Sequence, residues 1–164
     1  MQTEFKKVKY NTVKELIKVG EKLSFKAVNR DLEEVDFKAK KVTVVSPFPA
    51  ISTKICDEQT RGLSIIAEKY ADKVDVVSIS LDLPFTLADW CGAHGVENVD
   101  TLSDWRYLDF GKKTGFLVDK LHLLNRGVII VDENSVVKFV TANTNIHDQI
   151  NFEEVNSELD KLIK

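Results

Sequence analysis

The distribution of apolar and polar residues along the chain predicts alternating strands and helices. Residues 42–45 form a continuous apolar run that stops before Pro47 and Pro49, a pattern typical of a strand buried on both faces of a sheet. Residues 74–81 predict a second buried strand. Residues 1–40 instead alternate in short stretches with charged turns between them, which predicts short strands at the edges of the fold.

The segment between the two buried strands has helical periodicity. It predicts a helix that begins at about residue 53 or 54 and ends at residue 70, with Thr53 as a candidate N-cap. Cys56 would therefore lie in the first turn of this helix. The apolar positions that carry the helical spacing are Leu63, Ile66, Ala67 and Tyr70.

The second half of the chain continues the alternation. The break at residues 82–84 predicts the start of a helix that carries Cys91 near its end, with Gly92 as the candidate C-cap. The further predicted elements are a short apolar segment at 99–102, a helix around 106–112, a hairpin of strands 127–131 and 136–141, and a final helix over about 152–163.

Strands separated by helices, with one antiparallel hairpin near the end, predict an α/β fold around a mixed central sheet flanked by helices. The chain has 164 residues, of which 43% are hydrophobic and 30% charged, so it can bury a sizeable core. We expect residues 1–164 to form a single domain.

The charge distribution excludes some classes of partner. The formal net charge is -3, with lysines and acidic residues interspersed, which argues against nucleic acid or an anionic membrane as the main partner. The first residues are charged where a secretory signal is apolar, and no stretch approaches the roughly 20 apolar residues of a membrane span. We therefore expect a cytoplasmic protein, in which a pair of cysteines is catalytic or redox-sensing rather than a permanent cross-link.

The two cysteines, Cys56 and Cys91, are too far apart in sequence to form a local Cys-x-x-Cys pair. A thiol attacks as its thiolate, and the first turn of a helix favours an anion through its unpaired N–H groups and dipole. Asp57 and Glu58 in the same turn oppose this effect, so a nucleophilic Cys56 needs a cation from elsewhere in the chain. The three histidines are scattered and predict no metal site.

Two residues before Cys56 have suitable chemistry for a thiol site. Thr53 can direct its hydroxyl at the sulfur or at an oxygen substrate, and Pro49, which has no N–H, can shape a dry pocket wall. A buried inert cysteine behind an N-capping threonine would give the same local sequence, so these residues alone leave both interpretations open.

The spacing Pro49-x-x-x-Thr53-x-x-Cys56, at the start of a helix after a buried strand, matches the active-site motif of the peroxiredoxins. The chain resembles that family over nearly its whole length. Four further segments are similar to its thiol peroxidase branch, the atypical two-cysteine class: residues 19–22, 80–85, 90–95 and 126–134.

The resemblance implies a thioredoxin-like fold with an N-terminal β-hairpin, and it implies roles for single residues. Cys56 would be the peroxidatic nucleophile and Cys91 the resolving cysteine, while Thr53 and Arg126 bind the peroxide and stabilise the thiolate and Pro49 shields the site. Arg126 would supply the missing cation. The family often has aspartate where Ser52 stands and a small residue or proline where Lys54 stands, so the loop here departs from the usual pattern.

The implied function is a thioredoxin-dependent peroxidase that reduces hydrogen peroxide or alkyl hydroperoxides. Its Cys56 sulfenic acid would condense with Cys91 to an intramolecular disulfide that thioredoxin reopens, without a metal or organic cofactor. The resemblance also implies a homodimer. Two rivals stay open: a peroxide-sensing regulatory module that uses the same disulfide without rapid turnover, and a non-catalytic thioredoxin-like scaffold.

Overall fold

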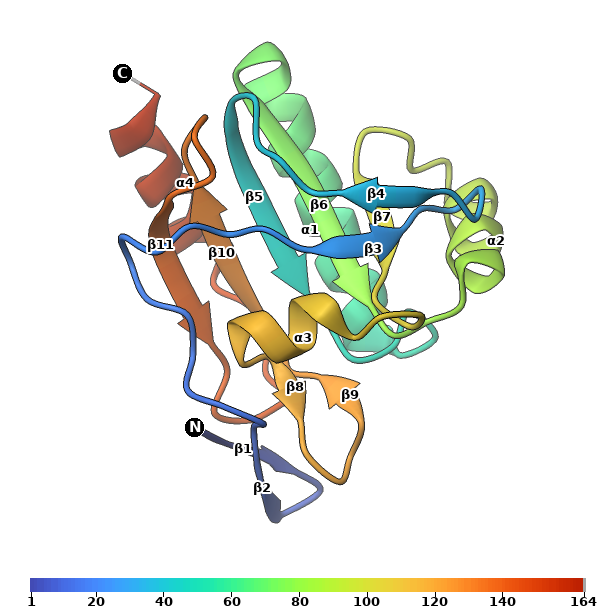
Figure 1. Cartoon of the computed structure of the whole chain (residues 1–164). Coiled ribbons are helices and arrows are strands. Elements are labelled where there is room, and N and C mark those ends of the chain that lie inside the picture. The colour runs from blue at the N-terminus through green and yellow to red at the C-terminus, as the bar shows by residue number, and fades with distance from the viewer. Residues whose placement is uncertain (164) are drawn as a thin grey trace.

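The computed structural model describes residues 1–163, which are built around a seven-stranded mixed sheet with the strand order β11-β10-β5-β6-β7-β3-β4 (Figure 1). The three central strands β5, β6 and β7 are parallel, and the strands outside them are antiparallel to their neighbours. The strands of this sheet are β3 (Lys26–Val28), β4 (Glu34–Asp36), β5 (Val42–Pro47), β6 (Val74–Ser80), β7 (Asp100–Ser103), β10 (Gly127–Val131) and β11 (Val137–Ala142).

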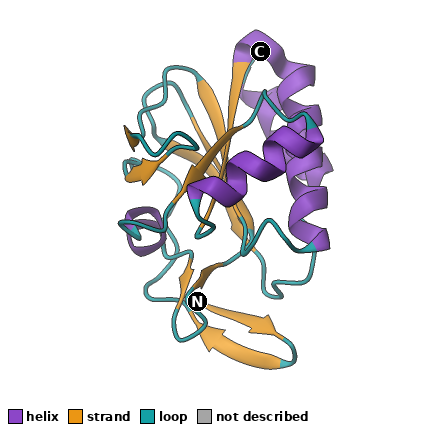
Figure 2. Cartoon of the chain, turned by 90° about the vertical axis from the view of Figure 1, so that its right-hand side faces the viewer, coloured by secondary structure: helices purple, strands orange, loops and turns teal. Residues whose placement is uncertain are grey.

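Helices cover both faces of the sheet, as the alternating pattern predicts. Three helices lie on one face and a single short one on the other, which is visible where the sheet is seen edge-on (Figure 2). The first face is covered by α1 (Lys54–Tyr70), α2 (Pro84–His94) and α4 (Phe152–Leu162), and the second by α3 (Asp109–Thr114); a 3-10 turn, η1 (Ala71–Lys73), follows α1.

The central strands are buried on both faces, which confirms the prediction from their apolar runs. Every residue of β5 is buried, and its side chains alternate between two cores. Val45 points into the core under α3, and Val44 points into the core under α1 and α4. This burial fixes the register of β5 against its parallel neighbour β6, because a shift by one residue would exchange the two faces.

The first forty residues form short strands, as predicted, but only β4 is an edge of the main sheet, because β3 pairs with both β4 and β7. The N-terminal strands form a separate hairpin at the lower end of the view in Figure 1. Its two-residue turn, Lys6 and Lys7, has positive φ angles of 49° and 66°, which suit a tight hairpin turn. The two strands are β1 (Gln2–Phe5) and β2 (Val8–Asn11).

The helix predicted around residues 106–112 is displaced, since α3 begins only at Asp109. The buried Asp104 carboxylate accepts hydrogen bonds from the backbone N–H groups of Phe110 and Gly111, at 3.0 and 2.8 Å, and so fixes where the helix starts. Leu108 adopts a left-handed conformation that turns the chain into it. Burial raises the pKa of Asp104 to about 6, although these N–H donors act in the opposite direction.

The C-cap predicted for the Cys91 helix was wrong. The helix continues through Gly92 to His94, and Gly95 is the capping residue, with φ 64° in the left-handed region and its N–H bonded to the carbonyl of Cys91. Cys91 therefore lies within the last turns of α2 rather than at its end.

The remaining predictions agree with the structure apart from one omission. The hairpin β10–β11 and helix α4 lie where expected, and the side chain of Asn151 caps α4 by accepting from the N–H of Glu154. A small hairpin formed by β8 (Leu117–Val118) and β9 (Leu123–Leu124) was not predicted. Within residues 1–163, none of the helices combines the length and apolar character that crossing a membrane requires.

Candidate active site

Cys56 lies in the first turn of α1, directly after the loop that leaves β5, as predicted. Its exposed fraction is 0%, and it packs with Phe48, Ile51 and Leu87 in a small apolar cluster, which we call the Cys56 cluster. The apolar neighbours exclude water from the thiol. The helix start places the positive end of the helix dipole beside the sulfur, the position that favours an anion.

A carboxylate on the next strand connection holds the loop before Cys56. Asp82 accepts hydrogen bonds from the backbone N–H of Ile51 at 2.8 Å and from the hydroxyl of Ser80 at 2.7 Å. Because Asp82 lies two residues after the end of β6, these bonds tie the Cys56 loop to the end of the central sheet. The sequence analysis did not assign Asp82 a role, and its only signal was a position after a buried strand.

Thr53 and Pro49 flank Cys56 on this loop. Thr53 is the residue before α1, as predicted, but its hydroxyl donates to the carbonyl of Ala50 at 2.9 Å instead of capping the helix. Its side chain is exposed, whereas Pro49 is buried. Thr53 thus closes the loop turn on the solvent side of the cysteine, and Pro49 lies on the protein side.

Arg126, far away in sequence, is brought to the Cys56 face of α1. Its side chain is only 2% exposed and donates to the carbonyl of Ile146 at 2.9 Å and to Oε1 of Gln59 at 2.6 Å. Gln59 follows Cys56 by three residues, so the two side chains lie on the same face of the helix. The structure therefore brings Arg126 to the same helix turn as the thiol.

Gln59 is the centre of a buried hydrogen-bond network. Its amide nitrogen donates to the hydroxyl of Ser46 at 2.7 Å and to the carbonyl of Pro47 at 3.2 Å, and Ser46 in turn donates to the carbonyl of Gly127 at 2.8 Å. These bonds fix the amide so that its oxygen faces Arg126. The sequence analysis missed Gln59, although a buried amide three residues after a cysteine, on the core face of a predicted helix, was a usable signal.

The charge of Arg126 is held by neutral groups. The partners that fix its guanidinium are an amide oxygen and a backbone carbonyl, not carboxylates. A buried cation without an anionic partner is costly, and an anion placed beside it is strongly favoured. This arrangement favours a thiolate, or a developing negative oxygen, at the Cys56 end of α1.

Cys91 has different surroundings. It is 2% exposed and belongs to the larger apolar core between the sheet and helices α1, α2 and α4. Its sulfur lies 3.3 Å from the hydroxyl of Thr101 on β7. Trp90, next to Cys91, packs against both this core and the Cys56 cluster. Cys56 and Cys91, the two cysteines of the chain, are both free thiols in the structure.

Charged and aromatic side chains near the two cysteines also connect α1 to α2. Asp57 pairs with Arg61 on α1, and the imidazole of His94 lies 4.0 Å from the same carboxylate. The His94 ring stacks on Trp90 with 4.2 Å between ring centroids. These contacts hold the end of α2 against the start of α1, beside both cysteines.

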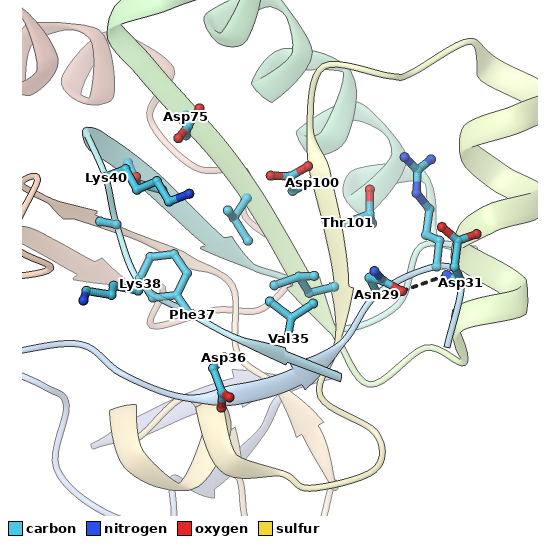
Figure 3. A pocket seen from close by; sticks show the side chains of 15 residues that line it. Asn29, Asp31, Val35, Asp36, Phe37, Lys38, Lys40, Asp75, Asp100 and Thr101 are labelled. Atoms are coloured by element: carbon cyan, nitrogen blue, oxygen red, sulfur yellow. Dashed lines mark hydrogen bonds between the residues drawn. The ribbon is translucent and has the colours of Figure 1, made fainter. Parts of the chain in front are cut away.

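A separate cavity of about 490 Å³ lies at the other end of the central strands, near the starts of β6 and β7 (Figure 3). Apolar side chains such as Val77 and Leu102 line it together with Asp75 and Asp100. Burial and the charge of Asp75 raise the pKa of Asp100, while Arg30 lowers it. Across the described residues 1–163, no group of three or more His, Cys, Asp or Glu side chains is placed to hold a metal ion.

Comparisons with known proteins identify the family. The Redoxin family model matches residues 10–159. A thiol peroxidase of Bacillus subtilis is 40% identical over 152 residues, covering 90% of each chain, and one of Oceanobacillus iheyensis is 42% identical over 126 residues, covering 77% of this chain and 76% of the relative. The crystal structure of a peroxiredoxin-like protein from Aquifex aeolicus superposes with a TM-score of 0.91 at 29% identity, covering 99% of this chain and 97% of that one.

These matches extend over nearly the whole chain and agree with the thioredoxin-like architecture and the N-terminal hairpin. The chain therefore belongs to the Redoxin family, among its peroxiredoxin-type peroxidases.

Proposed function

We propose that this chain, acting as a single domain, reduces hydrogen peroxide and organic hydroperoxides, with Cys56 as the nucleophile. The Cys56 thiolate attacks one peroxide oxygen, so that an S–O bond forms while the O–O bond breaks. The second oxygen leaves with the electron pair of the broken bond and takes up a proton to give water or an alcohol. The sulfur is left as a sulfenic acid.

The observation that carries this proposal is the buried cation with neutral partners that is bonded to Gln59, three residues after Cys56 on α1. Arg126 is 2% exposed and is fixed by Gln59 and a carbonyl, so its charge is available to an anion on the Cys56 face of α1. The same guanidinium suits the thiolate before the attack and the leaving oxygen during it. No cofactor takes part in this step.

Thr53 and Pro49 complete the proposed substrate site. The Thr53 hydroxyl, which donates to the carbonyl of Ala50, is exposed on the loop before Cys56 and can turn to bond a peroxide oxygen. Pro49 is buried and offers no N–H to compete for that oxygen. Ser52 and Lys54 are exposed, so the departures from the family pattern lie on the solvent side of the loop.

We further propose that Cys91 resolves the sulfenic acid to an intramolecular Cys56–Cys91 disulfide, which thioredoxin then reduces. A disulfide needs Cα atoms within about 7 Å and Cβ atoms that face each other. The two cysteines lie in different clusters, and Trp90 packs against both, so we expect local unwinding around one or both cysteines when the sulfurs meet.

A coupled assay tests the function. Peroxide consumption is followed with thioredoxin, thioredoxin reductase and NADPH for the wild type, C56S and C91S. We expect C56S to lose all turnover, and C91S to react once with peroxide and then stop because thioredoxin has no disulfide to reduce. Turnover by C56S at the wild-type rate would overturn the nucleophile assignment, and unchanged multiple turnover by C91S would overturn the resolving role.

The same assay separates the enzyme from a peroxide sensor. The sensor is favoured by the buried position of Cys91, because releasing it from the core would change the surface of α2. A sensor would oxidise once for each chain and would be reduced slowly, whereas the peroxidase consumes many equivalents of peroxide for each chain.

We also propose a cytoplasmic homodimer that associates beside the Cys56 loop. The support is a set of exposed apolar side chains at this end of the sheet, where Leu83 and Phe85 are 45% and 62% exposed and Trp105 is 40% exposed. The hydroxyl of Ser103 joins the two backbone segments that carry these side chains. It donates to the carbonyl of Asp82, next to Leu83, and accepts from the N–H of Trp105. Light scattering of the wild type and of F85E tests this, with a dimer expected for the first and a monomer for the second.

A further inference from the structure

One hydroxyl group contacts the thiol of Cys91. Thr101 lies on β7, 2% exposed, and its Oγ1 is 3.3 Å from the sulfur. In Figure 3, the side chains of Asp100 and Thr101, which both line the cavity, project to opposite sides of β7. Thr101 therefore faces the helices, and it ties the buried end of α2 to the sheet.

A second contact gives the Thr101 hydroxyl an acceptor besides the sulfur. The Thr101 hydroxyl also lies 3.4 Å from the carbonyl of Val99, which can only accept. When the hydroxyl donates to that carbonyl, it accepts from the S–H of Cys91. The contact then ties the Cys91 sulfur to β7 inside the apolar core.

We propose that Thr101 is a positioning residue that retains the Cys91 thiol in the folded α2 and so sets how fast Cys91 is released to resolve Cys56. This rests on the proposed resolving role of Cys91. Release breaks the Thr101 contact and exposes the thiol, which then loses its proton to solvent. The thiolate sulfur attacks the Cys56 sulfur, so that the S–S bond forms, the S–O bond of the sulfenic acid breaks, and hydroxide leaves and is protonated to water.

The rate of release decides the fate of the sulfenic acid. Until Cys91 arrives, the Cys56 sulfenic acid can react with a second peroxide to give sulfinic acid. The two reactions compete, so a faster release raises the peroxide concentration at which half of the chains become over-oxidised. Thr101 thereby controls resistance to peroxide without touching Cys56.

The test compares three variants at two residues whose hydroxyl groups lie on the same face of the sheet. T101V keeps the branched shape and removes the hydroxyl, and T101S keeps the hydroxyl. Ser78 is the matched control, because it pairs in register with Thr101 on the neighbouring strand, is fully buried, and has no hydrogen-bond partner for its hydroxyl among residues 1–163. S78A therefore removes a buried hydroxyl of the same row that does not contact Cys91.

Each protein receives one equivalent of hydrogen peroxide, and disulfide formation is timed by acid quench and mass spectrometry. Because a hydrogen bond of this kind contributes modestly, we expect T101V to form the disulfide about twofold to fivefold faster. The peroxide concentration for half-conversion to sulfinic acid should rise by the same factor. T101S and S78A should both resemble the wild type.

Three outcomes decide the proposal. A T101V rate equal to or below the wild-type rate overturns it, and so does acceleration in S78A as large as in T101V, since that would reflect general loosening of the core. T101S behaving like T101V also overturns it, because the hydroxyl would then be irrelevant. Failure of the wild type itself to form a Cys56–Cys91 disulfide would instead overturn the proposed function on which Thr101 depends.

Discussion

Cys56 and Cys91 are both buried thiols on helices, and they differ in what surrounds the sulfur. Cys56 lies at the start of α1, where a helix dipole and a buried guanidinium with neutral partners favour negative charge. Cys91 lies in the last turns of α2, in an apolar core where the hydroxyl of Thr101 is its polar contact. In the proposed mechanism, the first environment serves the attack of Cys56 on the peroxide, and the second holds Cys91 in the core until it resolves the sulfenic acid.

This contrast shows that equal burial does not mean equal chemistry. The exposed fractions of the two cysteines are 0% and 2%, so accessibility alone would rank them together. The difference comes from the polar groups within reach of each sulfur. Substitutions near Cys56 should therefore change the first oxidation, whereas those near Cys91 should change only disulfide formation.

The largest effect is expected for Arg126. R126M removes the buried cation and should lower the second-order rate constant for oxidation of Cys56 by about 100- to 1,000-fold, the usual loss when a charge-stabilising donor is deleted. R106M, at an exposed arginine between two aromatic rings, is the control. Stopped-flow fluorescence with hydrogen peroxide measures both, and an R126M rate within threefold of the wild type would contradict the role of the cation.

A smaller loss is expected at Gln59. Q59E replaces the neutral partner of Arg126 with a carboxylate that pairs with the guanidinium and competes with the thiolate for it, so the oxidation rate should fall about tenfold. E68Q, at an exposed position in the last turn of the same helix, should leave the rate unchanged. Equal rates for Q59E and the wild type would show that the neutrality of the network does not matter.

A third prediction concerns Trp90, which lies next to Cys91. W90L removes the ring that packs against both cysteine clusters and stacks on His94, so α2 should release more readily and the disulfide should form about threefold faster. The rate of Cys56 oxidation measured in the same traces should stay within twofold. T86A, at an exposed position on the same helix, is the control. Slower disulfide formation in W90L would mean that Trp90 guides Cys91 rather than retaining it.

The last prediction concerns stability rather than rates, at a residue away from both thiols. Burial raises the pKa of Asp104 to about 6 from 3.8, so the folded state holds this proton more tightly than the unfolded chain. The stability gained from protonation is complete below pH 3.8 and is lost as the pH rises through about 6. Relative to D104N, the wild type should lose about 2 kcal/mol of unfolding free energy between acidic and neutral pH.

Urea unfolding across that pH range measures this difference. Replacement of the exposed Asp148 by asparagine serves as the control, and its difference from the wild type should change little with pH. A difference between wild type and D104N that stays constant with pH would contradict the burial effect at Asp104.

Much of the fold could be predicted from local patterns. The buried strands β5 and β6, helix α1 and the hairpin β10–β11 follow from apolar runs and helical spacing, which are properties of the elements themselves. The start of α3 could not be predicted, because it depends on the burial of the nearby Asp104 carboxylate, which the local pattern does not show. The end of α2 was placed early because Gly92 is a plausible cap, but the left-handed residue is Gly95.

The residues of the candidate site could be predicted from the sequence, but the contacts between them could not. The spacing of Pro49, Thr53 and Cys56 is local and visible in the sequence. The contact of Gln59 with Arg126 joins residues 67 positions apart, and that of Cys91 with Thr101 depends on how α2 packs on β7. Such contacts follow from the packing of helices on the sheet, which the pattern of one segment does not contain.

The most direct test of the contrast between the two thiols is mass spectrometry of the wild type and C91S after one equivalent of hydrogen peroxide. The wild type should lose two hydrogens and give a peptide in which Cys56 is linked to Cys91 of the same chain. C91S should gain one oxygen, on Cys56. A wild-type protein that keeps the added oxygen, or oxidation that falls on Cys91 first, would contradict the assignment of Cys56 as nucleophile and Cys91 as the stored thiol.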